Sequence, residues 1–199
     1  MTLLPFVEVE EGPLERKRIF SFRQDRVKSG LSGRETRVDR ILAPDWVNVV
    51  AFDDDDNLLL VRQWRFGINE FSVEIPAGAI DHGEDPVVGG LRELAEETGH
   101  TPVDDAAVVL LGATRPNAAF MNNRCFTIFV PRARKTREQA LDPTEEVEVL
   151  KVPRAEIDDR VTAGSRRCAD RQTKTATDAL MDNSLVLVAL HLWKLHTGA

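Results

Sequence analysis

The sequence predicts a mixed α+β sandwich. Short apolar runs of strand length outnumber helical patterns, and the two kinds do not alternate regularly, so a doubly wound parallel sheet is not expected. The 199 residues fit one compact domain, or one domain with a small appendage. With 42% hydrophobic and 30% charged residues, the composition is that of a globular protein and excludes low-complexity and collagen-like classes.

The N-terminal residues predict a β-rich segment with little core of its own. Residues 19–22 form a short extended stretch, a turn follows at residues 30–33, and residues 34–42 give a second strand. Both strands are strongly polar, so they need another surface to pack on, either the rest of the chain or a second subunit. We therefore divide the chain into an N-terminal β-rich segment, 1–48, and a main domain, 49–199.

Six further strand patterns follow. The first two flank the run Asp53–Asn57, which is a hairpin signal. A metal-binding loop is one interpretation of the acidic run, but we favour a solvated turn. Asp and Asn suit turns, and no glutamate follows at calcium-loop spacing. The predicted strands are residues 46–52, 58–64, 71–76, 108–113, 125–130 and 147–152.

One helix is predicted at residues 85–98. Asp85 can cap its beginning, Pro86 fits its first turn, and Gly99 fits its C-terminal end. The Gly89-Gly90 pair inside it costs about 1 kcal/mol per glycine relative to alanine. Tight packing against the sheet is the structural interpretation of this pair, and the sequence offers no functional one.

A second, amphipathic helix is predicted at residues 185–195, capped by Asn183 or Ser184. Pro153 begins a polar segment before it, and the arginines of this segment could contact nucleic acid. They alternate with acidic residues, so a mobile surface loop is the favoured interpretation. The net charge of −7 and the pI of about 5.2 also argue against a nucleic-acid partner.

Three features of the sequence bear on the cellular compartment: the length of its apolar runs, its first residues and its cysteines. No apolar run reaches the length of a membrane span, and the first residues lack the basic and apolar regions of a secretory signal. Cys125 and Cys168 have no metal-site spacing and are interpreted as reduced thiols, with a single disulfide as the alternative. We expect a cytoplasmic protein with no membrane partner.

The chemistry is carried by residues 78–100. Glu93, Glu96 and Glu97 are spaced three and four apart on the predicted helix, which brings their carboxylates together on one face. Taken alone they also fit a solvated acidic face. A hard divalent cation would relieve their repulsion, and oxygen-only ligands favour Mg²⁺ or Mn²⁺ over Zn²⁺. Because Mg²⁺ usually shares its shell with substrate phosphates, we expect phosphate chemistry.

The whole stretch matches the pattern G-x5-E-x7-R-E-U-x-E-E-x-G-U, where U is a bulky aliphatic residue. The last position departs, because His100 stands there; we expect His100 and His82 at the surface. The pattern resembles that of the Nudix hydrolases. The matching residues are Gly78, Glu84, Arg92, Glu93, Leu94, Glu96, Glu97 and Gly99.

The resemblance implies an α/β/α sandwich on a mixed sheet and hydrolysis of a nucleoside diphosphate linked to another group. It assigns metal binding to Glu93, Glu96 and Glu97, and a catalytic role to Glu97. Arg92 would orient a glutamate. Gly78 and Gly99 would be structural, and Glu84 a weaker metal or water-positioning candidate.

Flanking residues resemble the branch that hydrolyses ADP-ribose and other nucleoside-diphosphate sugars. Val61–Arg65 precedes the motif and Glu74–Gly78 runs into it. The resemblance implies that the Ala77 carbonyl binds metal and that Arg65 lies near the diphosphate, with Glu74 beside it. A structural Arg65–Glu74 ion pair is the alternative. Pro116, sixteen residues after His100, is a marker of this branch, and the lack of tyrosine argues against diadenosine-polyphosphate hydrolases.

Further assignments rest on the resemblance. The loop that contains Pro116 and Asn122 would border the substrate pocket and contact the substrate, or else simply connect strands. Phe20 would stack on the adenine, or else pack in a core. Glu145 is the first choice for the general base and Glu146 the second, with a solvated acidic loop as the alternative.

The expected function is Mg²⁺-dependent hydrolysis of ADP-ribose to AMP and ribose 5-phosphate. The alternatives are the same chemistry on another nucleoside-diphosphate sugar, such as ADP-glucose, GDP-mannose or UDP-glucose, and a Nudix module that binds a nucleotide without cleaving it. The resemblance also implies a homodimer formed through the N-terminal strands.

Overall fold

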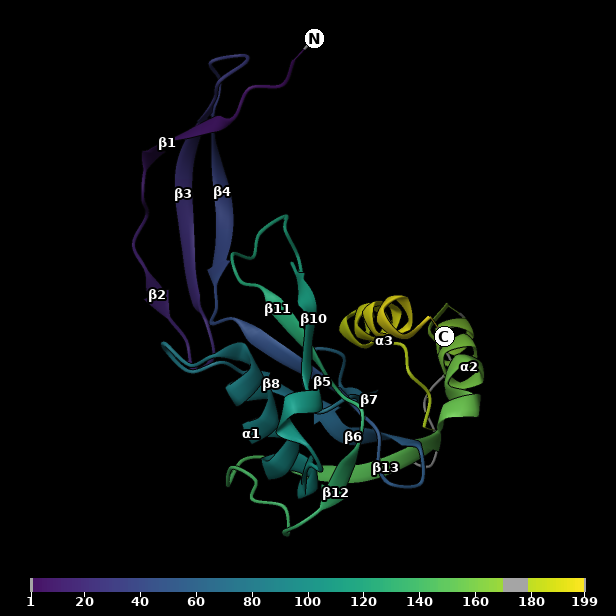
Figure 1. Ribbon diagram of the computed structural model, residues 1–199. Coiled ribbons are helices and arrows are strands. Elements are labelled where there is room, and N and C mark those ends of the chain that lie inside the picture. Colours follow the sequence, from purple (N-terminus) through teal and green to yellow (C-terminus); the bar gives the residue numbers. More distant parts are fainter. Residues whose placement is uncertain (1, 170–178, 199) are drawn as a thin grey trace. The chain divides into compact units, whose positions relative to one another are not determined.

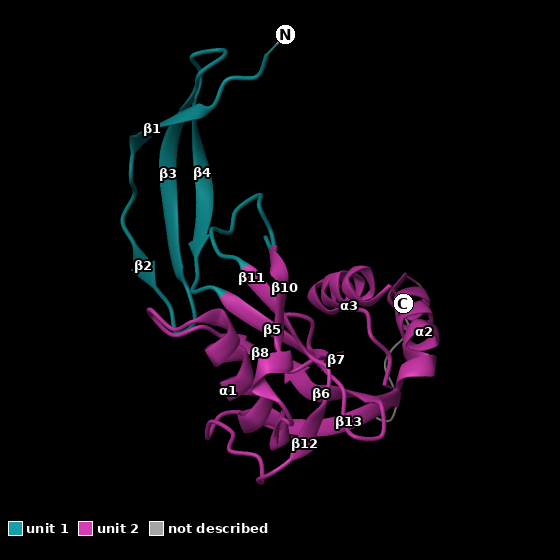
Figure 2. Cartoon of the chain, viewed as in Figure 1, with its two compact units in different colours: residues 1–45, 114–124 teal, residues 46–113, 125–199 magenta. Residues whose placement is uncertain are grey.

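The chain forms two compact units in a computed structural model that describes residues 2–169 and 179–198 (Figure 2). Unit 1 comprises Met1–Asp45 and Thr114–Arg124, and unit 2 comprises Trp46–Ala113 and Cys125–Ala199. The chain passes from unit 1 to unit 2 shortly before residue 49, where the main domain was expected to begin. The sequence did not indicate that residues 114–124 return to unit 1.

Unit 1 is a four-stranded antiparallel sheet (Figure 1). Its strands are β1 (Phe6–Glu10), β2 (Glu15–Arg16), β3 (Ser21–Ser29) and β4 (Glu35–Leu42), and β3 pairs with the other three. The strands β3 and β4 were expected, but β1 and β2 were not. Ion pairs join these polar strands: the fully buried Asp25 pairs with Arg23 at 2.9 Å and Arg40 at 3.1 Å.

Unit 2 contains two main sheets. One has the order β10-β11-β5-β8, in which β11 runs parallel to β5 and β8 antiparallel to it. The other is antiparallel, with the order β13-β6-β7. The strands are β5 (Trp46–Ala51), β6 (Asn57–Arg65), β7 (Glu70–Glu74), β8 (Ala77–Ala79), β10 (Val109–Thr114), β11 (Cys125–Val130) and β13 (Val147–Pro153), and the short β9 (His100–Pro102) pairs with β12 (Ala133–Lys135).

Three α-helices complete unit 2: α1 (Pro86–Thr98), α2 (Ile157–Ala169) and α3 (Ser184–Thr197), with short 3-10 turns at η1 (Asp105–Ala107) and η2 (Arg154–Glu156). Alternate residues of β5 belong to two separate cores. Val47 and Val49 pack in the core that contains Leu94 of α1, whereas Val50 packs in the core that contains Trp193 of α3. The helices α1 and α3 therefore cover opposite faces of the sheet (Figure 1). This α/β/α sandwich with a mixed sheet confirms the predicted fold class.

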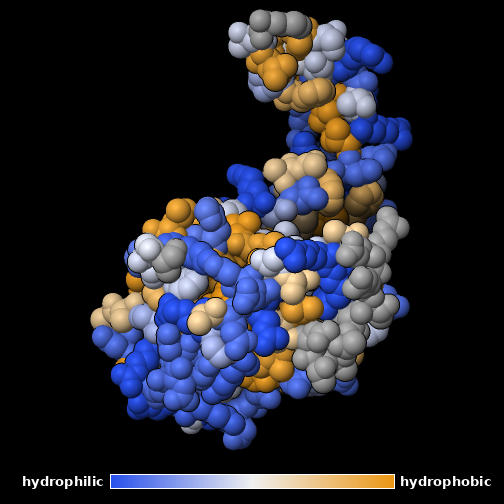
Figure 3. Space-filling model, turned by 90° about the vertical axis from the view of Figure 1, so that its right-hand side faces the viewer, coloured by the Kyte–Doolittle hydropathy of each residue, from blue (hydrophilic) through white to orange (hydrophobic). Residues whose placement is uncertain are grey.

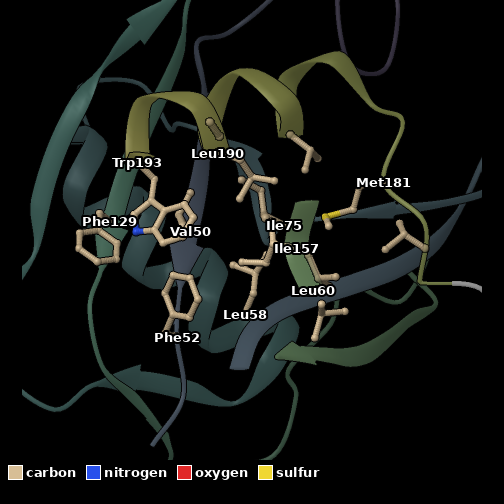
Figure 4. Packing of buried hydrophobic residues seen from close by; sticks show 14 residues of the cluster. Val50, Phe52, Leu58, Leu60, Ile75, Phe129, Ile157, Met181, Leu190 and Trp193 are labelled. Atoms are coloured by element: carbon tan, nitrogen blue, oxygen red, sulfur yellow. The ribbon is translucent and has the colours of Figure 1, made fainter. Parts of the chain in front are cut away.

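The core beneath α3 is built from large side chains that point toward one another (Figure 4). Trp193 projects from α3 onto Phe52, and their ring centroids lie 5.1 Å apart. Leu58 and Leu60 of β6 are fully buried beside them. Burial of such side chains stabilises the fold by about 1.5–3 kcal/mol each, so this core fixes α3 on the sheet.

The helix α1 has the predicted caps. The Asp85 carboxylate accepts hydrogen bonds from the first-turn N–H groups, and Gly99 closes the helix in the left-handed region, at φ 73°. A Cβ at Gly90 would lie 2.6 Å from Ile128 Cδ1 and 3.0 Å from Val47 Cγ2. Gly90 therefore lets α1 lie close to the sheet, as expected, whereas a Cβ at Gly89 would instead lie 2.9 Å from Glu84 Oε2.

The expected hairpin around Asp53–Asn57 forms only at its tip. The antiparallel bridge Phe52–Leu58 and a hydrogen bond of 2.9 Å from the Asp53 N–H to the Asn57 carbonyl join the ends of β5 and β6, but the two strands belong to different sheets. The turn is also not simply solvated, because three of its carboxylates form ion pairs with the last strands of unit 2 or with residues next to them. The pairs are Asp53–Lys151 at 2.7 Å, Asp54–Arg132 at 2.6 Å, Asp54–Arg134 at 2.7 Å and Asp56–Arg154 at 2.6 Å.

The segment after Pro153 contains α2, which the sequence did not reveal because the helix is mostly polar. Ile157 and Val161 supply its contacts with the core. Residues 170–178 of the basic segment lie outside the described residues. Among the helices that the structure describes, none is long and apolar enough to cross a membrane.

Candidate active site

The helix α1 directs two of its glutamates toward β8. The Glu97 carboxylate accepts a hydrogen bond from the Ala77 backbone N–H at 3.0 Å. The Glu93 carboxyl lies against Gly78, where a Cβ would come within 2.1 Å of its carbon. Glycine at position 78 therefore leaves room for a carboxylate, which gives the first glycine of the motif a steric reason in this chain.

Arg92 forms hydrogen bonds with three of the motif carboxylates, Glu84, Glu93 and Glu96. Its guanidinium forms two hydrogen bonds of 3.0 Å with Glu84, and its Nη1 donates to Glu93 at 2.8 Å and to Glu96 at 3.1 Å. It also donates to the Ala79 carbonyl at 3.0 Å. One arginine thus joins three glutamates to β8. The hydrogen bonds from Arg92 lower the pKa of Glu84 below its ordinary value.

Burial raises the pKa of two carboxylates of the site, Glu97 and Glu93. Glu97 is only 4% exposed, and its burial, reinforced by the nearby charges of Glu93 and Glu145, raises its pKa to about 8. Burial also raises the pKa of Glu93, against the opposing effect of Arg92. Carboxylates in this position are costly to ionise without a cation.

The donor set fits a hard divalent cation. It consists of carboxylate and backbone oxygens only, and the charge of Arg65 does not offset the burial of Glu97, whose pKa stays raised. Within residues 2–169 and 179–198, no three His, Cys, Asp or Glu side chains already converge as a metal site. The contacts explain this, because Arg92 and the Ala77 N–H each engage an oxygen of the motif glutamates.

Arg65 and Glu74 form a paired, two-bond contact between the adjacent strands β6 and β7. The distances are 2.9 Å from Nε and 2.7 Å from Nη2 to the two carboxylate oxygens. Burial of Glu74 acts to raise its pKa, but the bonds from Arg65 prevail and the pKa is lowered. Glu97 and Glu145 also interact electrostatically with Arg65, so the pair lies beside the α1 carboxylates.

The acidic loop before β13 brings one of the two candidate bases toward this group. Glu145 acts electrostatically on Glu93, Glu97 and Arg65. The side chains of Glu145 and Glu146 are both exposed. Their assignment as bases stays a prediction, and the position of Glu145 agrees with its place as first choice.

The other predicted substrate contacts, Phe20, Pro116 and Asn122, all belong to unit 1. Asn122 accepts a hydrogen bond from the Ala43 N–H at 3.0 Å and donates its own N–H to the Ile41 carbonyl at 3.3 Å. It therefore holds the 114–124 loop at the end of β4. Roles for these three residues in substrate binding stay predictions.

His100 is buried, so its expected surface position is wrong. The ring Nδ1 lies 2.9 Å from the Thr98 carbonyl, and burial lowers the pKa of the imidazole. A neutral ring at this pKa donates from Nδ1 to that carbonyl. The departure from the aliphatic motif residue is thus accommodated by a local hydrogen bond at the start of β9.

A family profile for the NUDIX domain matches residues 44–172, which is more than half of the chain. The chain belongs to the Nudix family. The region matched contains all the carboxylates of α1 together with Arg65 and the acidic loop. The family resemblance seen in the motif is therefore confirmed.

Two curated relatives of this Nudix protein show different coverage. It is 30% identical over 149 residues to the methanol dehydrogenase activator of Bacillus methanolicus, covering 72% of this chain and 78% of that protein. It is 39% identical over 70 residues to the ADP-ribose pyrophosphatase of Bacillus subtilis (strain 168), covering 35% of this chain and 38% of that one. The second match therefore spans less than half of either protein.

A solved structure described as an ADP compounds hydrolase has the same fold. It superposes with a TM-score of 0.69 and covers 99% of this chain and 95% of its own. The sequence identity is 20%, so this likeness concerns the Nudix fold alone.

Proposed function

We propose that this protein is a Mg²⁺-dependent pyrophosphatase that hydrolyses ADP-ribose to AMP and ribose 5-phosphate. The observation that carries the proposal is the buried carboxylate group of α1 beside the Arg65–Glu74 pair, all within unit 2. The family and the ADP-ribose pyrophosphatase relative from Bacillus subtilis support it.

Different residues would bind the cation and the diphosphate of the substrate. Glu93, Glu96, Glu97 and the Ala77 carbonyl would hold the cation, with Mn²⁺ as a substitute for Mg²⁺. When bound, such a cation supplies positive charge and lowers the pKa of a coordinated water. Arg65 uses two nitrogens for Glu74, and its Nη1 has no hydrogen-bond partner among the described residues, so it is available to a diphosphate oxygen.

A carboxylate on the acidic loop would take the proton of the attacking water. Glu145 is the better placed of the two candidates, because it lies within electrostatic reach of Glu97 and Arg65. General-base assistance of this kind contributes about 10²–10⁴-fold to a rate. Glu146 is the second choice, on the same loop.

The second candidate function is a Nudix module that binds a nucleotide to regulate another protein. The relative that covers 72% of this chain is named as an activator of an enzyme, which favours this alternative. All the motif glutamates are retained here, which favours hydrolysis.

The test is a comparison of kcat/KM with Mg²⁺ across ADP-ribose, ADP-glucose, GDP-mannose, UDP-glucose, NADH and diadenosine polyphosphates. The proposal expects the highest value for ADP-ribose, with AMP and ribose 5-phosphate as products. A higher kcat/KM for another sugar nucleotide would support the proposed pyrophosphatase reaction and show that its substrate is not ADP-ribose. Binding without turnover of any compound would reject the pyrophosphatase and favour the regulatory module.

We also propose a cytoplasmic homodimer assembled through unit 1. Apolar side chains gather on the surface of this unit, at the top of the view in Figure 3. The exposed apolar residues of this unit include Leu3, Leu4, Phe6, Val7 and Val9, which are 41–84% exposed. An exposed apolar surface of this kind is typical of an interaction site.

A further inference from the structure

The C-terminal end of α1 is capped by residues 136–140, called here the capping segment. The last carbonyls of a helix lack partners within the helix and need donors from elsewhere. Figure 1 shows where this segment lies, in the connection between β12 and β13. Its backbone hydrogen bonds run from Thr136 N and Arg137 N to the Gly99 carbonyl, at 2.9 and 3.2 Å, and from Ala140 N to the Glu96 carbonyl at 2.9 Å.

One side chain of the capping segment makes two further contacts. The Gln139 amide nitrogen donates to the Glu97 carbonyl at 2.6 Å and to the Val147 carbonyl at 3.1 Å. An amide group carries two N–H donors, so it can make both bonds at once. Glu97 belongs to the carboxylate group of α1, and Val147 begins β13 directly after the acidic loop. Gln139 therefore joins α1 to the far end of that loop.

A hollow of about 570 Å³ lies beside the two hydrogen bonds of Gln139, between the end of α1 and β13. Gln139 is exposed and borders this hollow, so hydrogen bonds attach it to α1, whereas Val147 is also held by its pairing with Gln63 of β6. The lining residues are Thr98, His100, Lys135, Gln139, Val147, Glu148, Val149 and Lys151.

We propose that Gln139 is a positioning residue for the hydrolytic reaction. Its amide fixes the distance between the backbone of Glu97 and the end of the loop that carries Glu145. The inference rests on the proposed function, because it concerns the placement of the candidate base relative to the α1 carboxylates. Small displacements of reacting groups lower the reaction rate strongly, since a displacement of about 1 Å can lower it by about 10²-fold.

The test replaces Gln139 with methionine, which has a similar length and no N–H donor. The variant should lower kcat on ADP-ribose by about tenfold or more, while KM changes by less than about twofold, because Arg65 and the carboxylates remain in place. Glu138→Gln is the matched control. Glu138 neighbours Gln139, is 89% exposed and pairs only with Lys135 among the described residues, so kcat and KM should both stay at the wild-type values.

A second readout uses the metal-free protein. Hydrogen exchange of the amides at residues 141–147 should be about fivefold faster in Gln139→Met, as the loss of one or two hydrogen bonds predicts. The Glu138→Gln variant should exchange like wild type.

Two results would overturn the proposal: unchanged exchange at residues 141–147 in Gln139→Met, or a folded Gln139→Met enzyme whose kcat lies within twofold of wild type. An equal rise in KM would indicate a binding role instead. If wild type itself fails to hydrolyse ADP-ribose, the proposed function fails, and the exchange measurement still decides whether Gln139 holds the loop.

Discussion

Two arginines hold the carboxylates of the site, and they do so in different ways. Arg92 spreads its nitrogens over Glu84, Glu93 and Glu96, so it neutralises a cluster. Arg65 gives both of its bonds to Glu74, which is 5% exposed. Hydrogen bonds from Ser72 and Asn183 add to this contact, but Arg65 supplies the positive charge that a buried carboxylate needs.

Replacing Arg65 with methionine should therefore destabilise the protein in a pH-dependent way. In wild type the lowered pKa of Glu74 contributes stability above about pH 4.5, and this contribution is lost as the pH falls. Without Arg65, the hydrogen bonds from Ser72 and Asn183 remain, but no positive charge offsets the burial, so the pKa of Glu74 rises. Urea unfolding should show a loss of about 2 kcal/mol at pH 7 that shrinks toward pH 4, where Glu74 is protonated.

The double variant Arg65→Met, Glu74→Gln provides the control for this prediction. A neutral amide does not require the arginine, so the stability at pH 7 should largely return, and the extra pH dependence should disappear. A loss that is the same at pH 7 and pH 4 would mean that Arg65 contributes packing and not charge compensation.

The sequence predicts the residue types of the site better than their contacts. The spacing of Glu93, Glu96 and Glu97 follows from helical geometry, so their shared helix face is visible in the sequence. The capping role of Gln139 is not, because it depends on a loop that folds back forty residues later. No spacing or composition signal marks such a contact.

At the level of the elements, the end of α1 is the most constrained point. Gly99 combines a φ of 73° with a carbonyl neighbour, because a Cβ there would lie 2.1 Å from the Arg137 oxygen. Gly83 has a similar φ of 81°, but nothing lies within 4 Å of a Cβ built on it. Gly99 therefore combines a left-handed backbone with a crowded Cβ position, whereas Gly83 has the left-handed backbone alone.

Alanine substitutions at the two positions should differ in cost. Gly83→Ala should lower the free energy of unfolding by about 1 kcal/mol, through the left-handed backbone alone. Gly99→Ala should lower it by about 2 kcal/mol more, because the capping segment must move away from the helix end. Urea unfolding of both variants measures the difference. Equal losses of unfolding free energy in the two variants would show that the capping segment can move away from the helix end without destabilising the protein.

The elements that the sequence predicts well have strong local signals. The helix α1 has both caps and β11 matches its predicted bounds, because the residues at their ends set those limits. The pairing of β5 and β6 was misjudged, since a turn between two apolar runs does not reveal which sheet each run joins. The helix α2 was missed because few of its residues contact the core.

At the scale of the whole molecule, the exposed apolar surface of unit 1 predicts a dimer. Light scattering after gel filtration should give about twice the chain mass of 22.3 kDa. Phe6→Asp, at a position that is 61% exposed, should shift the protein toward the monomer. Leu195→Asp, at a position on α3 that is 69% exposed, is the control and should leave the dimer intact. A wild-type monomer at micromolar concentration would contradict the assembly.

The most direct test of the central claim is AMP release from ADP-ribose, measured against Mg²⁺ concentration for wild type and Glu97→Gln. Because burial raises the pKa of Glu97 to about 8, its carboxyl group is mostly uncharged at neutral pH in the metal-free protein, so a neutral amide can replace it and the variant should stay folded. We predict Mg²⁺-dependent release by wild type and a loss of about a hundredfold or more in the variant. Full activity in folded Glu97→Gln, or no Mg²⁺-dependent release by wild type, would contradict the assignment of the α1 carboxylates.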